Sequence, residues 1–517
     1  MGVGVSVFRS DGSVLFKITK PNFINLFTTQ ALKRLKEVSI RKILGAKKAQ
    51  LVFQFLGEAL ILTILAGVIA LILFGVALPF YNQIAGKQIA FADILRPENI
   101  WIVLSMVIFT GLLSGLFPAL FISKFEPASS LKANQTPRST ASLFRKSLVV
   151  AQFVVAGFLI ISTVLIYQQM KLFRDAQLGF NKDQIAIVKM YGTFRDKVLA
   201  KDDVVKNELA SNPDIISIGK SSNIIGDDLS VESVTPVNNG QQREYPTVRV
   251  FRIDQNYLNV LGIKLKEGRN FSKDFNDSAS FIINEKAAEV LGLKNPLGAT
   301  VANNTRNVQG KVVGVIKDFH FTSLHNQIEP LVLEYHPEWT GSLLVKIRAG
   351  KTASVISFLQ AKVDKIAPGT LFSYSFLDDR IAGLYSKEDN MSQVLKAFTV
   401  LSIIISCLGL FGLVAHASEI RTREIGIRKV IGASVSNLVR LLSKDFMILV
   451  LIGNLIAWPI AWYAVNKWLN SFNYRIQIDW KVFALSGVLI LLIAMLTIAF
   501  HCIKTARANP VKSLRTE

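Results

Sequence analysis

The sequence predicts a polytopic α-helical membrane protein with about six transmembrane helices and one large extracytoplasmic α+β domain. Three observations lead to this fold class: six long apolar stretches, positive charge gathered beside them, and a region of mixed strand and helix patterns between the third and fourth stretches. With 517 residues, half of them apolar, the chain is also too long and too hydrophobic for one ordinary soluble domain.

Six stretches are long enough to cross a bilayer as helices. A hydrocarbon core about 30 Å thick needs roughly 20 mostly apolar residues, and lipid offers the backbone no hydrogen-bond partner but itself. The first thirty residues lack the order of a cleaved signal peptide, so we expect insertion to rely on the spans themselves. The predicted spans are 52–80, 100–122, 148–168, 394–416, 446–468 and 482–503.

The formal net charge of +22 is concentrated beside the spans. Residues 169–392 hold 28 Lys and Arg against 26 Asp and Glu, so the excess lies elsewhere. Most of it falls in 1–51, 123–147, 417–445 and 504–517, which alternate with the spans. The positive-inside rule then predicts cytoplasmic N- and C-termini and an extracytoplasmic 169–392 segment. We therefore expect contact with membrane lipid and no nucleic-acid partner.

The cysteines and histidines predict no metal site. Cys407 and Cys502 both fall inside predicted spans, so neither a disulfide framework nor a zinc site is expected. His320 and His325 follow Asp318 at a spacing that matches no known ligand pattern.

A nucleotide site is not expected either. Gly219, Lys220 and Ser221 match the end of a phosphate-binding loop, but Asp214 stands where its first glycine is required. The sequence predicts no catalytic residues and no cofactor for this chain, and ATPase activity is expected in a separate subunit.

Between the third and fourth spans, the patterns are those of an α+β domain. From Leu384 to Leu408 there is neither Gly nor Pro, which predicts one continuous helix from about Asp378 or Asp379 into the membrane. Strand-like runs cover 185–190, 248–253, 312–316 and 343–347, and helix-like runs cover 194–211 and 353–366.

A repeat is the most informative feature of the chain. The segment Glu37–Ala46 (EVSIRKILGA) recurs as Glu424–Ala433 (EIGIRKVIGA), with six of ten positions identical. A second likeness joins Glu126–Lys132 (EPASSLK) to Asn509–Arg515 (NPVKSLR). Two homologous membrane units are therefore expected, and only the second has a span directly before its motif.

The repeated motif resembles the FtsX-like permease domain of ABC transporters, and Val312–His325 resembles the periplasmic domain of the MacB-like group. The resemblance implies a long variant with two fused four-helix units, each with an external domain between its first and second helices. Asn22–Leu26 resembles the end of the second helix of the first unit, so the chain looks shortened at its N-terminus.

The resemblance and the spans together divide the chain into five parts. These are a cytoplasmic N-terminal segment with the first coupling motif (1–51), an incomplete first FtsX-like unit of two helices (52–135), a transmembrane helix (145–168), an extracytoplasmic MacB-like domain (169–392) and a second FtsX-like unit of three helices (393–512).

The resemblance implies that the motif receives movement from an ATPase. Arg428 and Lys429 would present positive charge beside an apolar stripe that includes Ile427 and Ile431, and Gly432 would end or bend the helix. The competing explanation is that the basic residues only anchor and orient the chain in the membrane. The candidate coupling residues are Glu37, Arg41, Lys42 and Gly45 in the first copy and Glu424, Arg428, Lys429 and Gly432 in the second.

The function expected from the resemblance is that of an ABC transporter permease subunit in the bacterial inner membrane. It would couple a separate cytoplasmic ATPase to an extracytoplasmic domain and export a substrate such as a drug, peptide or lipoprotein. A second permease chain would supply the missing helices. The alternatives are an ATP-driven signalling or scaffold protein that regulates a cell-envelope partner, a membrane-bound enzyme, and a non-functional truncated remnant.

Overall fold

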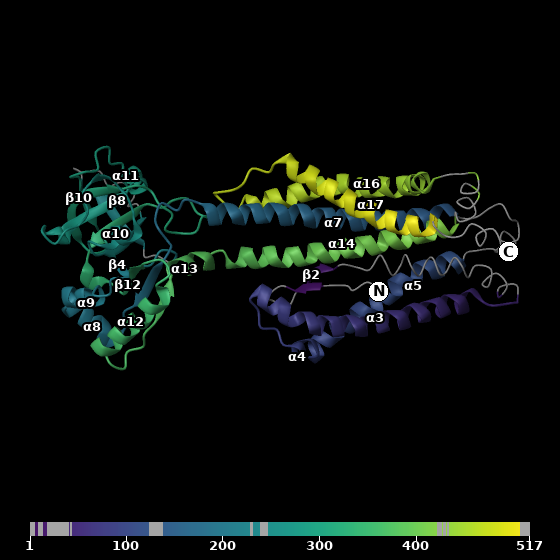
Figure 1. Cartoon of the computed structure of the whole chain (residues 1–517), viewed down its shortest axis with the longest axis horizontal. Coiled ribbons are helices and arrows are strands. Elements are labelled where there is room, and N and C mark those ends of the chain that lie inside the picture. The colour runs from purple at the N-terminus through teal and green to yellow at the C-terminus, as the bar shows by residue number, and fades with distance from the viewer. Residues whose placement is uncertain are drawn as a thin grey trace. The chain divides into compact units, whose positions relative to one another are not determined.

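The computed structural model describes residues 6–8, 14–17, 41, 44–123, 138–227, 231–237, 247–420, 427, 431 and 434–506. The chain forms two compact units (Figure 1). The membrane unit comprises 1–169, 389–468 and 477–517, and the α/β domain comprises 170–388 together with 469–476.

Six helices in the described residues are long and apolar enough to cross a membrane, so the predicted spans are confirmed. A short helix, α4 (Phe91–Ile94), lies between the first two, and β1 (Ser6–Phe8) pairs with β2 (Val14–Lys17). The six are α3 (Lys48–Ala85), α5 (Pro97–Ser123), α7 (Arg138–Asp175), α14 (Ser386–Ile420), α16 (Val435–Leu469) and α17 (Trp480–Ala506) (Figure 1).

Four of these helices share one apolar core. Small residues let α7 approach α16 closely: a Cβ on Gly453 would lie 2.9 Å from the Cβ of Phe153, and one on Gly157 would lie 2.9 Å from that of Ala457. The helix before the α/β domain therefore packs with the three helices that follow it. The core residues are Val149, Phe153 and Ile160 of α7, Leu410, Leu413 and Val414 of α14, Phe446 and Val450 of α16, and Ile490, Ala494 and Ile498 of α17.

The helices α3 and α5 form a hairpin of their own. They meet at Gly111 and Gly115, where an added Cβ would lie 2.9 Å from Leu60 Cδ2 and 2.8 Å from Ala59 Cβ. Only 11% of the apolar window of α3 is buried, against 61% of that of α7. The described residues thus leave most of the apolar surface of α3 for lipid or other helices to cover.

The strands of the α/β domain are β3 (Ile185–Lys189), β4 (Ile215–Ser221), β5 (Val231–Pro236), β6 (Thr247–Ile253), β7 (Leu265–Gly268), β8 (Ser280–Asn284), β9 (Thr300–Asn303), β10 (Val308–Ile316), β11 (Leu331–Tyr335), β12 (Ser342–Ile347) and β13 (Tyr374–Phe376). The four predicted strand-like runs appear as β3, β6, β10 and β12. The helices are α8 (Gly192–Ala200), α9 (Asp202–Leu209), α10 (Tyr257–Leu261), α11 (Glu285–Val290), α12 (Thr352–Ile366) and α13 (Leu377–Gly383), with short 3₁₀ turns at Asp277–Ala279 and Pro337–Trp339.

Six strands close into a barrel. The ring runs β6, β11, β8, β10, β9, β5 and back to β6, and β7 pairs with β10 outside the ring. Alternate residues of each strand face the interior. That interior is apolar over most of its length, with Val234, Val250, Phe281, Val301 and Val332 among its buried side chains.

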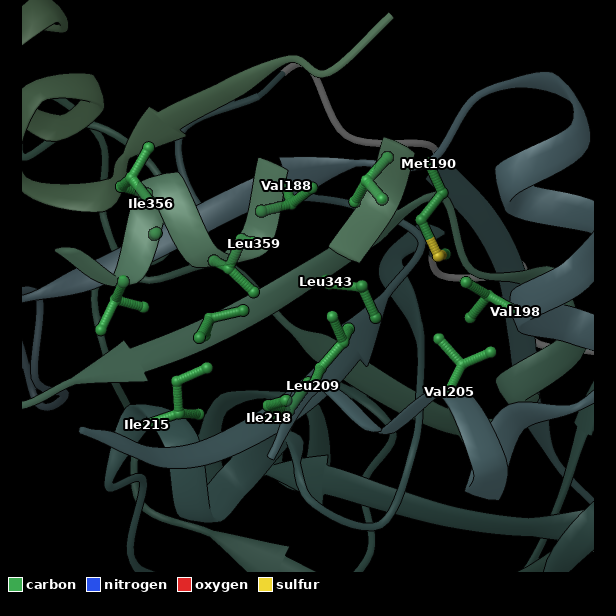
Figure 2. Close-up of a cluster of buried hydrophobic side chains, with 14 of the residues drawn as sticks. Val188, Met190, Val198, Val205, Leu209, Ile215, Ile218, Leu343, Ile356 and Leu359 are labelled. Carbon is green, nitrogen blue, oxygen red and sulfur yellow. The ribbon is translucent and has the colours of Figure 1, made fainter. Parts of the chain in front are cut away.

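A second sheet continues from the barrel in the order β4, β12, β3, β13. It joins the barrel where Ser221 of β4 pairs with Ile253 of β6. The helices α8, α9 and α12 bury their apolar faces against this sheet (Figure 2). The side chains labelled there include Val188, Met190 and Leu343 of the sheet, Val198 and Leu209 of α8 and α9, and Ile356 and Leu359 of α12.

The helix-like run predicted over 194–211 forms two helices, α8 and α9, in place of one continuous helix. Lys201 separates α8 from α9 with φ −135° and ψ 50°, outside the helical region. Asp202 and Asp203 occupy the first turn of α9, where carboxylates interact favourably with the helix dipole. A new helix therefore starts at these residues.

The continuous helix predicted from Asp378 or Asp379 is wrong. The short helix α13 ends at Gly383, and α14 begins at Ser386. Between them, the side chain of Tyr385 is buried and its hydroxyl accepts a 2.9 Å hydrogen bond from the N–H of Leu324. This tertiary contact turns the chain before α14 starts.

Candidate functional site

The repeated motif is the candidate site, and the structure describes part of each copy. Arg41 and Gly45 of the first copy and Ile427 and Ile431 of the second are described. The other predicted coupling residues lie outside the described residues: Glu37, Lys42, Glu424, Arg428, Lys429 and Gly432.

The first copy ends in a glycine-dependent turn. Arg41 is helical, and the N–H of Ala46 donates a 3.0 Å hydrogen bond to the carbonyl of Arg41. Gly45 has φ +96°, a left-handed conformation that strains a residue with a Cβ. The N–H of Ala46 thus bonds to a carbonyl five residues earlier, and the residue before Ala46 is a left-handed glycine. This is the pattern of a Schellman motif, which ends a helical turn. The helix-ending role predicted for Gly432 stays a prediction, since Gly432 lies outside the described residues; its counterpart Gly45 lies in a left-handed turn.

Polar contacts tie this turn to the start of α3. The Arg41 Nη1 donates to Gln54 Oε1 at 3.0 Å, and the Gln54 Nε2 donates to Glu58 Oε1 at 3.3 Å. In addition, the N–H of Lys47 donates to Gln50 Oε1 at 3.0 Å. These hydrogen bonds link the turn of the first motif to the first turns of α3.

Both copies expose an apolar side chain at the same position. Leu44 is 80% exposed and its counterpart Ile431 is 79% exposed, while Ile427, one turn earlier, is 46% exposed. Single exposed apolar residues are common on proteins, but recurrence at equivalent positions beside basic residues favours a contact surface. We call Leu44 and Ile431 the motif apolar pair.

The α/β domain holds a buried charged cluster at one end of the barrel interior. Asn303 Nδ2 donates to Glu232 Oε2 at 2.6 Å and to Glu334 Oε1 at 2.7 Å. Arg252 Nη2 donates to Glu232 Oε1 at 2.5 Å, and Arg306 Nη1 donates to Glu334 Oε2 at 2.9 Å. All four carboxylate oxygens thus accept hydrogen bonds, and both carboxylates are paired with arginines. We interpret this barrel-end cluster as structural.

A second buried cluster contains the lysine of the rejected phosphate-loop match. Lys220 lies in β4, 1% exposed, with Nζ 3.0 Å from the carbonyl of Pro337 and 3.0 Å from Asp202. A buried lysine in a strand is not available to cradle a phosphate. Burial lowers the pKa of Lys220. Burial also opposes the charge of Lys206, but Asp254 at 2.6 Å and Asp202 outweigh it and raise the pKa of Lys206.

The two histidines considered as metal ligands contact aromatic rings instead. His320 meets Tyr474 edge-on at 4.7 Å between ring centroids, and burial lowers the pKa of His320. His325 lies 4.5 Å from the ring of Phe472. In the part of the chain that the structure describes, no group of three or more His, Cys, Asp or Glu side chains is arranged to hold a metal ion.

Asp277 gives the α/β domain a predictable response to acid. Burial raises its pKa, but two 2.8 Å bonds from Arg269 and further bonds from the Ser272 N–H and the Ser280 hydroxyl outweigh this and lower the pKa. A lowered native pKa stabilises the fold above the unfolded value of about 3.9, and the stabilisation disappears as the pH falls through the native pKa. Asp277→Asn should therefore destabilise the domain at pH 7 and weaken its acid sensitivity.

Thermal unfolding of the detergent-purified chain at pH 7 and at about pH 2 checks this prediction, because the stabilisation is lost below the unfolded pKa of about 3.9. The wild type should lose more stability than Asp277→Asn between the two pH values. Asp274→Asn, which removes an exposed carboxylate from the same loop, serves as the control. Equal losses for the wild type and Asp277→Asn would contradict the assignment.

Comparison with known proteins matches both units. The FtsX-like permease C-terminal family matches twice, at 21–127 and at 396–510, and the MacB-like periplasmic core domain matches 153–354. The double match confirms the repeat found in the sequence.

Individual relatives are distant. The chain is 23% identical to the uncharacterized ABC transporter permease YknZ of Bacillus subtilis, over 51% of this chain and 69% of YknZ. It is 24% identical to the macrolide export ATP-binding/permease protein MacB of Aggregatibacter actinomycetemcomitans, over 45% of this chain and 38% of MacB. The crystal structure of the periplasmic region of MacB from Actinobacillus actinomycetemcomitans aligns at 18% identity with a TM-score of 0.28, covering 41% of this chain and 97% of that one.

The matched families fit the architecture described above, with apolar spans on either side of an α/β domain. The match to the MacB relative covers less than half of that relative's length. Two matches to the permease family and one to the periplasmic core domain cover most of the chain between residues 21 and 510. The chain therefore belongs to the FtsX-like and MacB-like family of ABC transporter permeases.

Proposed function

We propose that this permease couples a separate cytoplasmic ATPase to movement of its α/β domain, and that the movement exports a substrate such as a drug, peptide or lipoprotein. The observation that carries the proposal is the repeated motif. Each copy presents a strongly exposed apolar side chain of the motif apolar pair within a basic segment. An ATPase dimer needs two equivalent contact points, and a repeated motif provides them.

The contacts of the first copy support transmission from the motif to the membrane. Arg41 is bonded to Gln54 near the start of α3, so an ATPase that moves the motif also moves that helix. The second copy precedes α16 directly in the chain. In this proposal, both motifs and both termini are cytoplasmic, and the α/β domain is extracytoplasmic in the inner membrane.

The small buried fraction of α3 supports a further partner. A second permease chain that supplies helices against α3 and α5 would cover apolar surface that the described residues leave open. Membrane lipid is the alternative cover. A signalling or scaffold role would use the same ATPase contact and differ only in what the α/β domain acts on.

The test is co-purification of the membrane-extracted chain with its ATPase, compared with a charge-reversed variant. Arg428→Glu with Lys429→Glu should lose the ATPase while the chain still inserts into the membrane. Lys146→Glu, which reverses one exposed charge of α7 on the same expected side, is the matched control and should keep the ATPase. Full recovery of the ATPase with the double variant would favour simple membrane anchoring.

A further inference from the structure

The segment that joins α16 to α17 belongs structurally to the α/β domain, although it lies far away in the sequence. Residues 469–476 group with 170–388 and not with the membrane unit. Of these eight residues, Leu469 and Phe472 are buried, with 1% and 4% of their surfaces exposed. A phenylalanine in a short connection between two membrane spans is buried only where that connection packs against other residues.

Phe472 and Asn473 hold the segment on the domain. The Phe472 ring lies 4.5 Å from that of His325 and 5.5 Å from that of Phe173. Asn473 donates to the carbonyl of His325 twice, from Nδ2 at 2.7 Å and from its N–H at 3.3 Å. An aromatic contact with two hydrogen bonds to one carbonyl fixes both the position and the orientation of the segment.

Several contacts fix the position of His325, so it forms a defined packing site for residues 469–476. We call this site the seat, and the packing of 469–476 on it the seating. Its Nδ1 lies 2.7 Å from the Ser323 hydroxyl, and its Nε2 lies 3.4 Å from Glu388 Oε1. Its ring stacks on that of Tyr385 at 6.1 Å, with 16° between the ring planes. Tyr385 and Glu388 flank the start of α14, so the seat also involves the point at which the chain leaves the domain.

Two covalent connections between the domain and the membrane spans, α7 and α14, are evident from the sequence. The segment at 469–476 makes a third connection through contacts with His325, and it continues α16, the helix that follows the second motif. We propose that Phe472 and Asn473 are positioning residues that deliver movement of α16 to the α/β domain at His325. The source of the movement, an ATPase, rests on the proposed function. The packing of residues 469–476 on His325 does not depend on it.

The seating is tested on the full chain in detergent without nucleotide, by hydrogen exchange. Phe472→Ala should raise amide exchange in 320–326 and in 469–476 by about tenfold or more, because it removes the buried anchor. Asn473→Ala removes only the donated side-chain bond and should raise exchange less in the same peptides. Arg475→Ala, whose exposed side chain pairs with Asn470 inside the segment, is the control and should leave 320–326 unchanged. Unchanged exchange in Phe472→Ala would overturn the seating.

Transmission is tested in the complex with the co-purified ATPase. ATP should change hydrogen exchange of the α/β domain in the wild type and in Arg475→Ala, and this response should be lost in Phe472→Ala and reduced in Asn473→Ala. ATPase co-purification and hydrolysis should stay within about twofold of the wild type in all variants. A full ATP response in Phe472→Ala, with its segment loosened, would overturn transmission through His325. A wild type that binds no ATPase would contradict the proposed function and transmission together, while the nucleotide-free experiment would still decide the seating.

Discussion

Replacing Glu334 by alanine is expected to lower the free energy of unfolding of the α/β domain by about 3–5 kcal/mol. The Glu334 side chain is 2% exposed and pairs with Arg306 at 2.9 Å and with Arg252 at 3.3 Å. Both guanidinium groups are largely buried, with 12% and 16% of their side chains exposed. Removal of the carboxylate therefore takes the carboxylate partner from Arg306 and leaves Arg252 paired with Glu232 alone. One hydrogen of the Asn303 amide also loses its acceptor.

Urea unfolding followed by hydrogen exchange in β5, β9 and β11 measures this change within the domain. The matched control is Glu338→Ala, which removes a carboxylate whose side chain is 55% exposed and should change the stability by less than about 1 kcal/mol. Equal small effects of the two substitutions would show that the barrel-end cluster is open to water.

Placing aspartate at both positions of the motif apolar pair is expected to weaken binding of the ATPase by about a hundredfold. Loss of one well-buried apolar contact at an interface commonly costs about 1–2 kcal/mol, and tenfold in affinity corresponds to about 1.4 kcal/mol. Leu44→Asp or Ile431→Asp alone should cause about half of the effect in free energy, because each motif would contact one ATPase subunit. A charge at either site is also poorly tolerated against an apolar partner.

Titration of the detergent-purified permease with the ATPase measures these affinities. Leu95→Asp, at a leucine that is 51% exposed in the segment between α4 and α5 on the opposite expected side, is the control. It should leave the affinity unchanged. An equal loss from Leu95→Asp would point to a general disturbance of the membrane unit, and no loss from the double variant would remove the motif apolar pair from the interface.

The sequence was sufficient for the features that depend on length and local pattern. The six spans follow from hydropathy, and β3, β6, β10 and β12 follow from short apolar runs. The repeat located the candidate site, and Gly45, the counterpart of Gly432, has the left-handed conformation that favours glycine. The roles of the remaining coupling residues stay predictions, because Glu37, Lys42, Glu424, Arg428, Lys429 and Gly432 lie outside the described residues.

Features that depend on distant partners could not be predicted. Nothing near Tyr385 in the sequence indicates the hydrogen bond from Leu324 that separates α13 from α14. The barrel closes because β6 pairs with β11, about eighty residues away in the sequence. A glutamate within an apolar strand, such as Glu334, gives no sign in the sequence that it is buried and paired. The one indication in the sequence that the short loop between α16 and α17 is packed was its aromatic content, Phe472 and Tyr474, together with the histidines of 320–325.

The membership of residues 469–476 in the α/β domain also sets an order of assembly. Residues 389–468, eighty in all, separate the main part of the domain from its last segment. At a synthesis rate of about 5–20 residues per second, this gap takes about 4–16 seconds to translate. During that time the rings of Phe173 and His325 lack their contact with Phe472. The domain thus becomes complete only after α16 has been synthesised, since its last segment follows that helix in the chain.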